Sequence, residues 1–189
     1  SHIVKYLDIP LQHVDSALLQ RMRRPSSIEE IREKLEKLRE SVPDIFLRTT
    51  FLVGFPGEDE EAFQRLLSFV EDFRFERMGA FTYSESPDVS SASLYPKVEE
   101  KVKQERYKEL MKVQEKVMRE FHSSLVGREL EVIVDEVQRE NGINHCWGRT
   151  YGDAPEVDGK ISFSSRKSKL KRGEIVKVKV TESSSYELK

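Results

Sequence analysis

Cysteine is almost absent from this chain of 189 residues, since Cys146 is its only one. A single cysteine excludes an internal disulfide bond, a Cys-x-x-Cys redox pair and a metal cluster held by cysteines of this chain alone. Cys146 lies beside Trp147 in a segment expected to form strands, where a small packed apolar side chain is a commoner role than a reactive nucleophile. The sequence leaves both roles open.

The chain also lacks long apolar runs and a bias toward one sign of charge. No run approaches the roughly 20 residues that span a bilayer, and the first residues do not resemble a signal peptide. The net charge is −2, which gives no overall preference for nucleic acid. The four histidines are far apart and show no metal-ligand spacing. We therefore expect a cytoplasmic protein without a membrane partner, in which any basic surface is local.

Residues 1–126 alternate between strand and helix patterns, which is typical of a parallel sheet with helical crossovers. Strands are expected at residues 3–9, 45–53 and 78–83. Helices are expected after Asp15, after the Ser27 and Glu30 capping box, after the acidic residues 58–61, and over residues 97–125, with Gly127 as the terminator.

From residue 127 onward the helical periodicity is lost, and apolar residues alternate with polar ones as in Leu130, Val132 and Val134. Turns are expected at Asn141-Gly142 and at Asp158-Gly159. Residues 127–189 therefore predict a small antiparallel barrel similar to an oligonucleotide-binding fold.

The segment from Arg48 to Glu58 predicts a buried strand that enters a tight turn. Gly54 and Gly57 bracket Phe-Pro, so the backbone can approach a ligand at the carboxyl end of the strand, where α/β folds bind ligands. A simple strand-to-helix turn is the alternative. For the carboxylates at 58–61 we predict helix-dipole and solubility roles rather than acid–base chemistry.

A second segment, Tyr-Leu-Asp-Ile-Pro-Leu-Gln-His at residues 6–13, places polar groups at the same edge of the sheet. Gln12 has both a donor and an acceptor and suits ligand orientation. His13 has no nucleophile or carboxylate at a recognisable spacing, so a structural hydrogen bond is the commoner role and proton transfer the alternative.

The C-terminal region contains opposing charges. Five of the seven residues at 166–172 are cationic and could contact phosphates or form a solvated hairpin. Three carboxylates at 153–159 oppose them, and residues 127–189 hold 12 Lys and Arg against 11 Asp and Glu. This balance favours protein recognition over nucleic-acid binding.

Together, the motifs at residues 6–13, 19–24, 48–58, 81–84 and 153–159 resemble the radical S-adenosylmethionine (SAM) methylthiotransferases. The Pro-Leu-Gln-His and Asp-Ala-Pro-Glu-Val-Asp-Gly motifs resemble the RimO branch, which adds a methylthio group to the β-carbon of an aspartate in ribosomal protein S-twelve through a 5′-deoxyadenosyl radical. The tRNA-modifying MiaB branch, whose TRAM domain binds RNA, is the alternative.

The resemblance implies an α/β fold in two domains. Residues 1–126 would form the C-terminal half of a partial, TIM-like radical SAM barrel, and residues 127–189 a TRAM domain. It also implies SAM and two 4Fe-4S clusters as cofactors of a full-length, monomeric enzyme. The ligands of both clusters are absent from this chain, which is therefore expected to be inactive alone and to hold no catalytic residue.

The resemblance further implies two sets of site residues. Those expected to contact SAM are Gln12, Arg48, Val53, Gly54, Phe55, Pro56, Phe81 and Tyr83, although Gln12 and Arg48 could instead serve packing or an internal salt bridge. Those expected to contact the substrate are Asp153, Glu156, Asp158, Arg166, Lys167 and Lys169. Residues 85–96 depart from the family pattern, so no contact is carried over to them.

Overall fold

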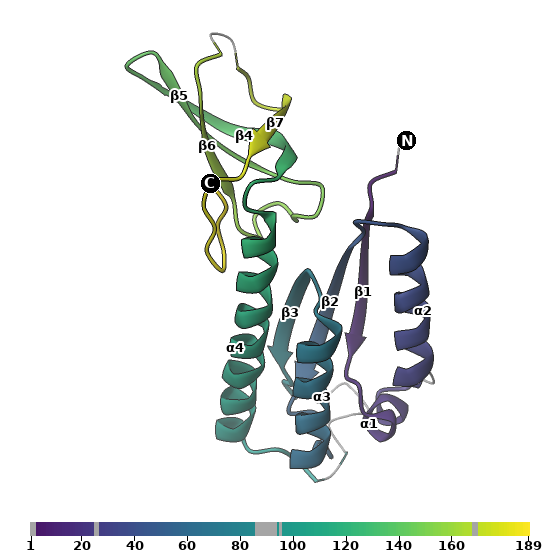
Figure 1. Ribbon diagram of the computed structural model, residues 1–189. Coiled ribbons are helices and arrows are strands. Elements are labelled where there is room, and N and C mark those ends of the chain that lie inside the picture. Colours follow the sequence, from purple (N-terminus) through teal and green to yellow (C-terminus); the bar gives the residue numbers. More distant parts are fainter. Residues whose placement is uncertain (1–2, 25–26, 86–93, 95, 168–169) are drawn as a thin grey trace. The chain divides into compact units, whose positions relative to one another are not determined.

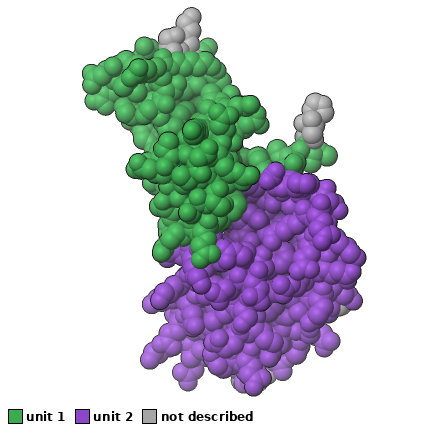
Figure 2. Space-filling model, in the orientation of Figure 1, with its two compact units in different colours: residues 1–6, 118–189 green, residues 7–117 purple. Residues whose placement is uncertain are grey.

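The computed structural model describes residues 3–24, 27–85, 94, 96–167 and 170–189 (Figure 1). The chain divides into two compact units, residues 7–117 and residues 1–6 with 118–189 (Figure 2). The loop at residues 85–96 lies largely outside the described residues.

The first unit is built on a parallel sheet with strand order β1-β2-β3, whose three arrows run in one direction in Figure 1. The strands are β1 (Tyr6–Gln12), β2 (Phe46–Val53) and β3 (Arg77–Thr82), and the helices are α1 (Ser16–Arg21), α2 (Ile28–Ser41), α3 (Glu60–Phe73) and the first part of α4 (Glu100–Leu125), whose residues from 118 on belong to the second unit. Helices connect consecutive parallel strands, which confirms the predicted α/β class.

Side-chain caps fix where the first three helices begin. The carboxylate of Asp15 accepts a hydrogen bond from Leu18 N–H at 3.0 Å, and Ser27 Oγ accepts one from Glu30 N–H at 3.2 Å. Both caps were predicted. The third helix is capped by Asp59, whose Oδ1 accepts from Ala62 N–H at 2.7 Å. Each cap satisfies a backbone donor that the helix itself leaves unpaired.

The two faces of the sheet differ in burial. On β2, alternate residues Leu47, Thr49, Phe51 and Val53 are buried among the apolar side chains of the helices, and Phe51 is 0% exposed. The residues between them are only partly buried. Paired residues of a parallel ladder point to the same side, so Leu52 shares this second face with Phe81, which is 65% exposed. We call this second face the open face; it includes Asp8, Arg48, Thr50, Leu52 and Phe81.

The second unit is an antiparallel sheet with strand order β6-β5-β4-β7. Its strands are β4 (Glu129–Glu140), β5 (Ile143–Arg149), β6 (Ile161–Ser165) and β7 (Ile175–Lys179). The two edge strands contribute Ile161 and Val178 to one core with Val132 and Leu125, so the sheet curls upon itself. The expected turn at Asn141-Gly142 joins β4 to β5, with φ of 49° and 79°.

Two sequence predictions need correction. The first strand was expected at residues 3–9, but it begins at Tyr6 and reaches Gln12, because pairing with β2 rather than apolar composition sets its limits; Ile3 is 83% exposed. The second concerns Asp158-Gly159, which lies within a long loop and not in a tight hairpin. A Cβ atom on Gly159 would lie 1.7 Å from the carbonyl oxygen of Tyr186, so this glycine permits a close backbone approach.

Substituting a phenylalanine on each face of the sheet tests whether the two faces contribute differently to stability. We expect Phe51→Ala to lower the free energy of unfolding by about 3–5 kcal/mol, since it opens a cavity in the buried core. Phe81→Ala removes a ring that is mostly exposed and should cost less than about 1 kcal/mol. Urea titration of both variants measures the difference, and equal losses would show that the open face is packed in solution.

Candidate site at the carboxyl ends of the parallel strands

The turn after β2 is shaped by side chains of this chain that press against it. Gly54 and Gly57 have φ of +76° and +95°, which side chains rarely adopt. A Cβ atom on Gly54 would lie 2.3 Å from Lys103 Cγ, and one on Gly57 would lie 2.2 Å from Arg21 Nη1. Both glycines therefore permit close packing of the chain around its own turn.

A buried carboxylate, that of Glu58, holds this turn from within. Its Oε2 accepts a hydrogen bond from Gly54 N–H at 2.9 Å, and its Oε1 accepts one from Arg106 Nη1 at 2.7 Å. The Glu58 side chain is 0% exposed and that of Arg106 is 8% exposed. Arg106 Nη1 also donates to the backbone oxygen of Glu58 at 3.0 Å. The ion pair thus joins the turn to α4.

His13 completes the buried group, which we call the Glu58 cluster: Glu58, Arg106 and His13. Its Nδ1 accepts a hydrogen bond from Asp15 N–H at 2.9 Å, so the proton of a neutral ring lies on Nε2, 3.4 Å from Glu58 Oε2. The ring is fully buried. His13 therefore makes the structural hydrogen bond that the sequence favoured, but it also has a carboxylate neighbour, Glu58, that the spacing did not reveal.

The helix-dipole role predicted for residues 58–61 was wrong for Glu58. Asp59 caps α3, and Glu58, one residue earlier, turns inward. Only Glu60 and Glu61 lie in the first helical turn. The pKa of Glu60 is lowered by hydrogen bonds, first from Gln64 and then from Arg106.

Sequence reasoning also missed Arg106 and Lys103. Lys103 Nζ donates to Tyr83 O at 3.1 Å, so α4 holds the end of β3 as well as the turn after β2. Both cations are buried and share a helical face with Leu110, which is 0% exposed. Charged residues on the apolar stripe of a helix were the signal that could have indicated them.

The residues expected to contact SAM lie at or near the carboxyl ends of the strands, except Arg48, which lies near the amino end of β2, and they differ in exposure. Val53, Phe55 and Tyr83 are buried in the chain's own cores, and the rings of Phe55 and Tyr83 pack edge to face at 5.2 Å. Gly54 and Pro56 are buried within the turn. By contrast, three of the set keep exposed or partly exposed side chains: Gln12, Arg48 and Phe81.

Gln12 and Arg48 each have a distinctive setting. Gln12 is the last residue of β1 and has φ of +69°, an uncommon conformation for a residue with a side chain. Arg48 Nε lies 3.9 Å from Asp8 Oδ2 across the open face. The internal ion pair that the sequence left open is therefore present.

The acidic residues expected to contact substrate partly stabilise their own loop. Asp153 Oδ2 accepts hydrogen bonds from Thr150 N–H at 2.8 Å and from Thr150 Oγ1 at 2.6 Å, and it is buried. Asp158 Oδ2 accepts from Ala154 N–H at 2.6 Å. Glu156, between them, is exposed with φ of +64°.

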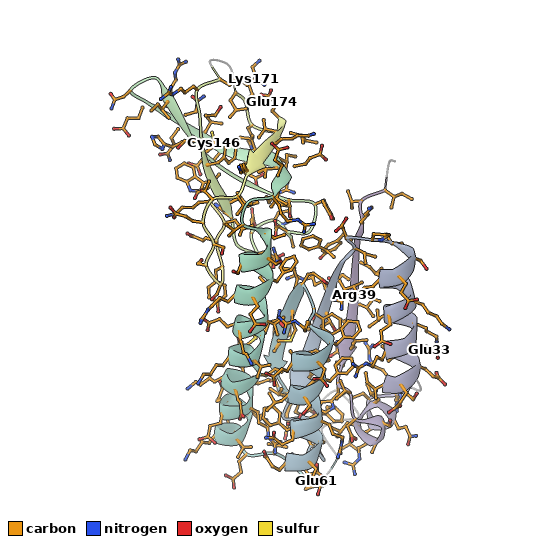
Figure 3. All side chains as sticks on the ribbon, viewed as in Figure 1. Glu33, Arg39, Glu61, Cys146, Lys171 and Glu174 are labelled. Carbon is orange, nitrogen blue, oxygen red and sulfur yellow. The ribbon has the colours of Figure 1, made fainter. Side chains whose placement is uncertain are left out.

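The basic residues of the same prediction lie elsewhere in the sheet unit. Arg166 is exposed, Lys167 forms an ion pair with Glu174, and Lys169 lies outside the described residues. The hydrogen bonds from Lys167 and from Lys171 N–H lower the pKa of Glu174; Figure 3 labels Lys171 and Glu174 near one end of this unit. Burial raises the pKa of the Cys146 thiol, which favours the packed role over a nucleophilic one.

Within the described ranges, no three His, Cys, Asp or Glu side chains are grouped so that they could hold a metal ion. Among the helices of those same ranges, none is both long enough and apolar enough to cross a membrane.

Comparison with known proteins defines the class. Residues 1–70 match the model of the radical SAM superfamily, and residues 126–189 match that of the TRAM domain. The chain thus joins a radical SAM segment to a TRAM domain, which confirms the resemblance and fold class drawn from the motifs.

Individual relatives share one name, that of a ribosomal protein methylthiotransferase. The chain is 46% identical over 187 residues to the ribosomal protein uS12 methylthiotransferase RimO of Carboxydothermus hydrogenoformans, covering 99% of this chain and 42% of that protein. It is 45% identical over 186 residues to the proteins of the same name from Geotalea uraniireducens and Caldanaerobacter subterraneus, covering 98% of this chain and 41% of each. The chain is therefore similar over nearly its whole length to radical SAM methylthiotransferases, and it spans about two fifths of the length of these relatives.

The Glu58 cluster should dominate the stability of the first unit. We expect Glu58→Gln to lower the free energy of unfolding by about 3–5 kcal/mol, because it removes the buried partner of Arg106 and leaves this charge only the exposed carboxylate of Glu60. Glu61→Gln removes the same charge from an exposed site three residues away and should change stability by less than about 0.5 kcal/mol. Denaturant titration compares the two, and similar values would contradict the role given to the buried pair.

Proposed function

We propose that this chain supplies one wall of the SAM site and the TRAM domain of a methylthiotransferase that modifies an aspartate of ribosomal protein uS12. The observation that carries the proposal is that Gln12 and Phe81 lie at or near the carboxyl ends of β1 and β3, where the Glu58 cluster fixes the turn after β2, with Arg48 on the same open face nearer the amino end of β2. Rigid support of this kind preorganises a ligand site. The names of the similar proteins support the substrate.

The chemistry of the exposed residues fits SAM. An amide such as Gln12 can donate to and accept from ribose hydroxyls, and the Arg48 guanidinium can pair with the methionine carboxylate. The mostly exposed ring of Phe81 offers a face on which adenine can stack. The other five residues of the set would hold the pocket in place through side-chain packing and backbone position: Val53, Gly54, Phe55, Pro56 and Tyr83.

The residues of this chain do not fit an iron–sulfur cluster. A 4Fe-4S cluster is held by several cysteine thiolates, whereas this chain has one cysteine and that one is buried. Both clusters are therefore assigned to parts of the full-length protein outside this chain. Bound SAM would supply the radical chemistry, while the residues described here bind and orient it.

We also retain the domain boundary at residues 126 and 127, and a monomeric, cytoplasmic full-length enzyme. For the TRAM domain, recognition of the protein substrate is preferred to RNA binding. The exposed cations Arg166, Lys171 and Arg172 keep RNA as the second candidate.

Mass spectrometry of cells with and without the gene for the full-length protein tests the function. We expect one aspartate of uS12 to gain a methylthio group only when the gene is present. Digested tRNA from the same cells serves as the comparison, and a gene-dependent methylthio group on tRNA with unmodified uS12 would overturn the proposal.

Arg48 gives a sharper test of the SAM site. In the full-length protein, Arg48→Gln should raise the SAM dissociation constant about 10- to 100-fold, because it removes a charge-assisted hydrogen bond. Asp8→Asn is the matched control, since it breaks the same internal ion pair and keeps the guanidinium. Isothermal calorimetry with SAM, with melting curves of both variants, separates the two roles. If Arg48→Gln lowers only stability and leaves SAM affinity unchanged, Arg48 is a packing residue.

A further inference from the structure

A cavity in the sheet unit has aromatic and acidic residues in its lining. It is open to solvent, has a volume of about 390 Å³, and is lined by residues of β4, β5 and β6, by the loop before β6, and by the C-terminal segment. This volume is sufficient for one long side chain. Its lining residues include Trp147, Tyr186, Glu136, Asp158 and Glu187.

Strand register fixes the floor of this cavity. Trp147 of β5 pairs with Glu136 of β4 and with Ser162 of β6, so the three side chains form a row on one face of the sheet. Glu136 accepts a hydrogen bond from Gln138 Nε2 at 2.8 Å, which holds its carboxylate in place. The indole of Trp147 therefore lies beside a carboxylate whose position is set by the ladder.

The C-terminal segment forms the opposite wall. A bridge between Ser183 and Leu188 closes a small hairpin, and Ser184 Oγ accepts hydrogen bonds from Tyr186 N–H at 3.3 Å and Glu187 N–H at 3.0 Å. The hairpin crosses Gly159 so closely that a side chain there would displace the Tyr186 backbone. The loop and the hairpin thus hold the Tyr186 ring, 58% exposed, at the cavity.

The negative charge of the lining residues favours a cationic ligand. Three carboxylates line the cavity against one cation, Lys160. Within the described part of the chain, neither Glu136 nor Glu187 forms an ion pair. A phosphate would be repelled here, whereas a guanidinium can stack on an aromatic ring and form paired hydrogen bonds with a carboxylate.

We propose that this cavity binds an arginine side chain of the protein substrate, between Trp147 and Tyr186 and against the carboxylates of Glu136 and Glu187. The inference rests on the proposed function for the identity of the partner, and it assigns protein recognition to the TRAM domain. It also gives a role to Asp158, since the acidic motif at residues 153–159 supplies part of the lining.

The test uses the fluorescence of Trp147, the only tryptophan of the chain. The probe is the capped peptide Gly-Ser-Arg-Ser-Gly, and its control contains citrulline, which keeps the shape of arginine without its charge. We expect the arginine peptide to change the Trp147 emission saturably and the citrulline peptide to bind at least about tenfold more weakly. Equal binding of the two peptides would overturn the proposal.

Variants locate the site. Glu187→Gln and Tyr186→Ala should each weaken the arginine peptide about 5- to 30-fold. Glu140→Gln, an exposed carboxylate on β4 away from the cavity, should leave affinity unchanged. Circular dichroism melting confirms that each variant is folded. If Glu140→Gln and Glu187→Gln weaken binding equally, the peptide senses only overall charge and the cavity is not its site.

Two further measurements test whether the cavity binds RNA instead and whether the arginine pocket stands independently of the proposed function. An oligouridine that changes the Trp147 emission of the unchanged chain saturably, and at lower concentration than the arginine peptide, would assign the cavity to RNA and overturn the proposal. In the full-length protein, Glu187→Gln should raise KM for uS12 and leave kcat unchanged. If uS12 is never modified but the arginine peptide binds as expected, the proposed function fails and the arginine pocket stands.

Discussion

The buried ion pair between Glu58 and Arg106 is the interaction on which the first unit depends. Its carboxylate holds Gly54 N–H, and its guanidinium holds the backbone oxygen of Glu58, so the turn after β2 and helix α4 are fixed together. A buried pair contributes little net stability compared with apolar packing, but loss of one partner is costly. We infer that the pair specifies the turn geometry, because an alternative geometry would leave the buried carboxylate of Glu58 without its cation.

This arrangement assigns different tasks to the two faces of the sheet. The helix side holds Phe51, Leu66 and the other core residues, whose burial provides most of the hydrophobic stabilisation. The open face carries Asp8, Arg48 and Phe81 and contributes little to that core. Because their side chains add little to that core, Arg48 and Phe81 are available for ligand chemistry. The Glu58 cluster provides rigidity at the turn after β2, at the carboxyl end of that strand.

Much of this fold could be predicted from the sequence because its signals are local. The caps at Asp15 and Ser27, the Asn141-Gly142 turn and the α/β alternation each depend on a few neighbouring residues. The Glu58 cluster could not be predicted, since its partners are up to 48 residues apart and an inward Glu58 looks the same in sequence as a solvated Glu61. Gly159 was misread for the same reason: its close neighbour, Tyr186, is distant in the chain. Local patterns therefore specify the elements, whereas the site depends on contacts between them.

The distribution of charge in the sheet unit bears on its partner more than the net charge does. The counts of cations and anions are nearly equal. However, Lys167 is paired with Glu174, and the carboxylate of Asp153 accepts hydrogen bonds from Thr150 within its own loop. What remains at the 390 Å³ cavity is acidic and aromatic, a combination that attracts guanidinium and disfavours phosphate. A domain built to hold RNA would need cations along an extended surface, because each phosphate contact adds to affinity. An acidic pocket suits instead a partner that inserts one basic side chain. A protein loop can supply such a side chain, whereas a nucleic-acid backbone cannot.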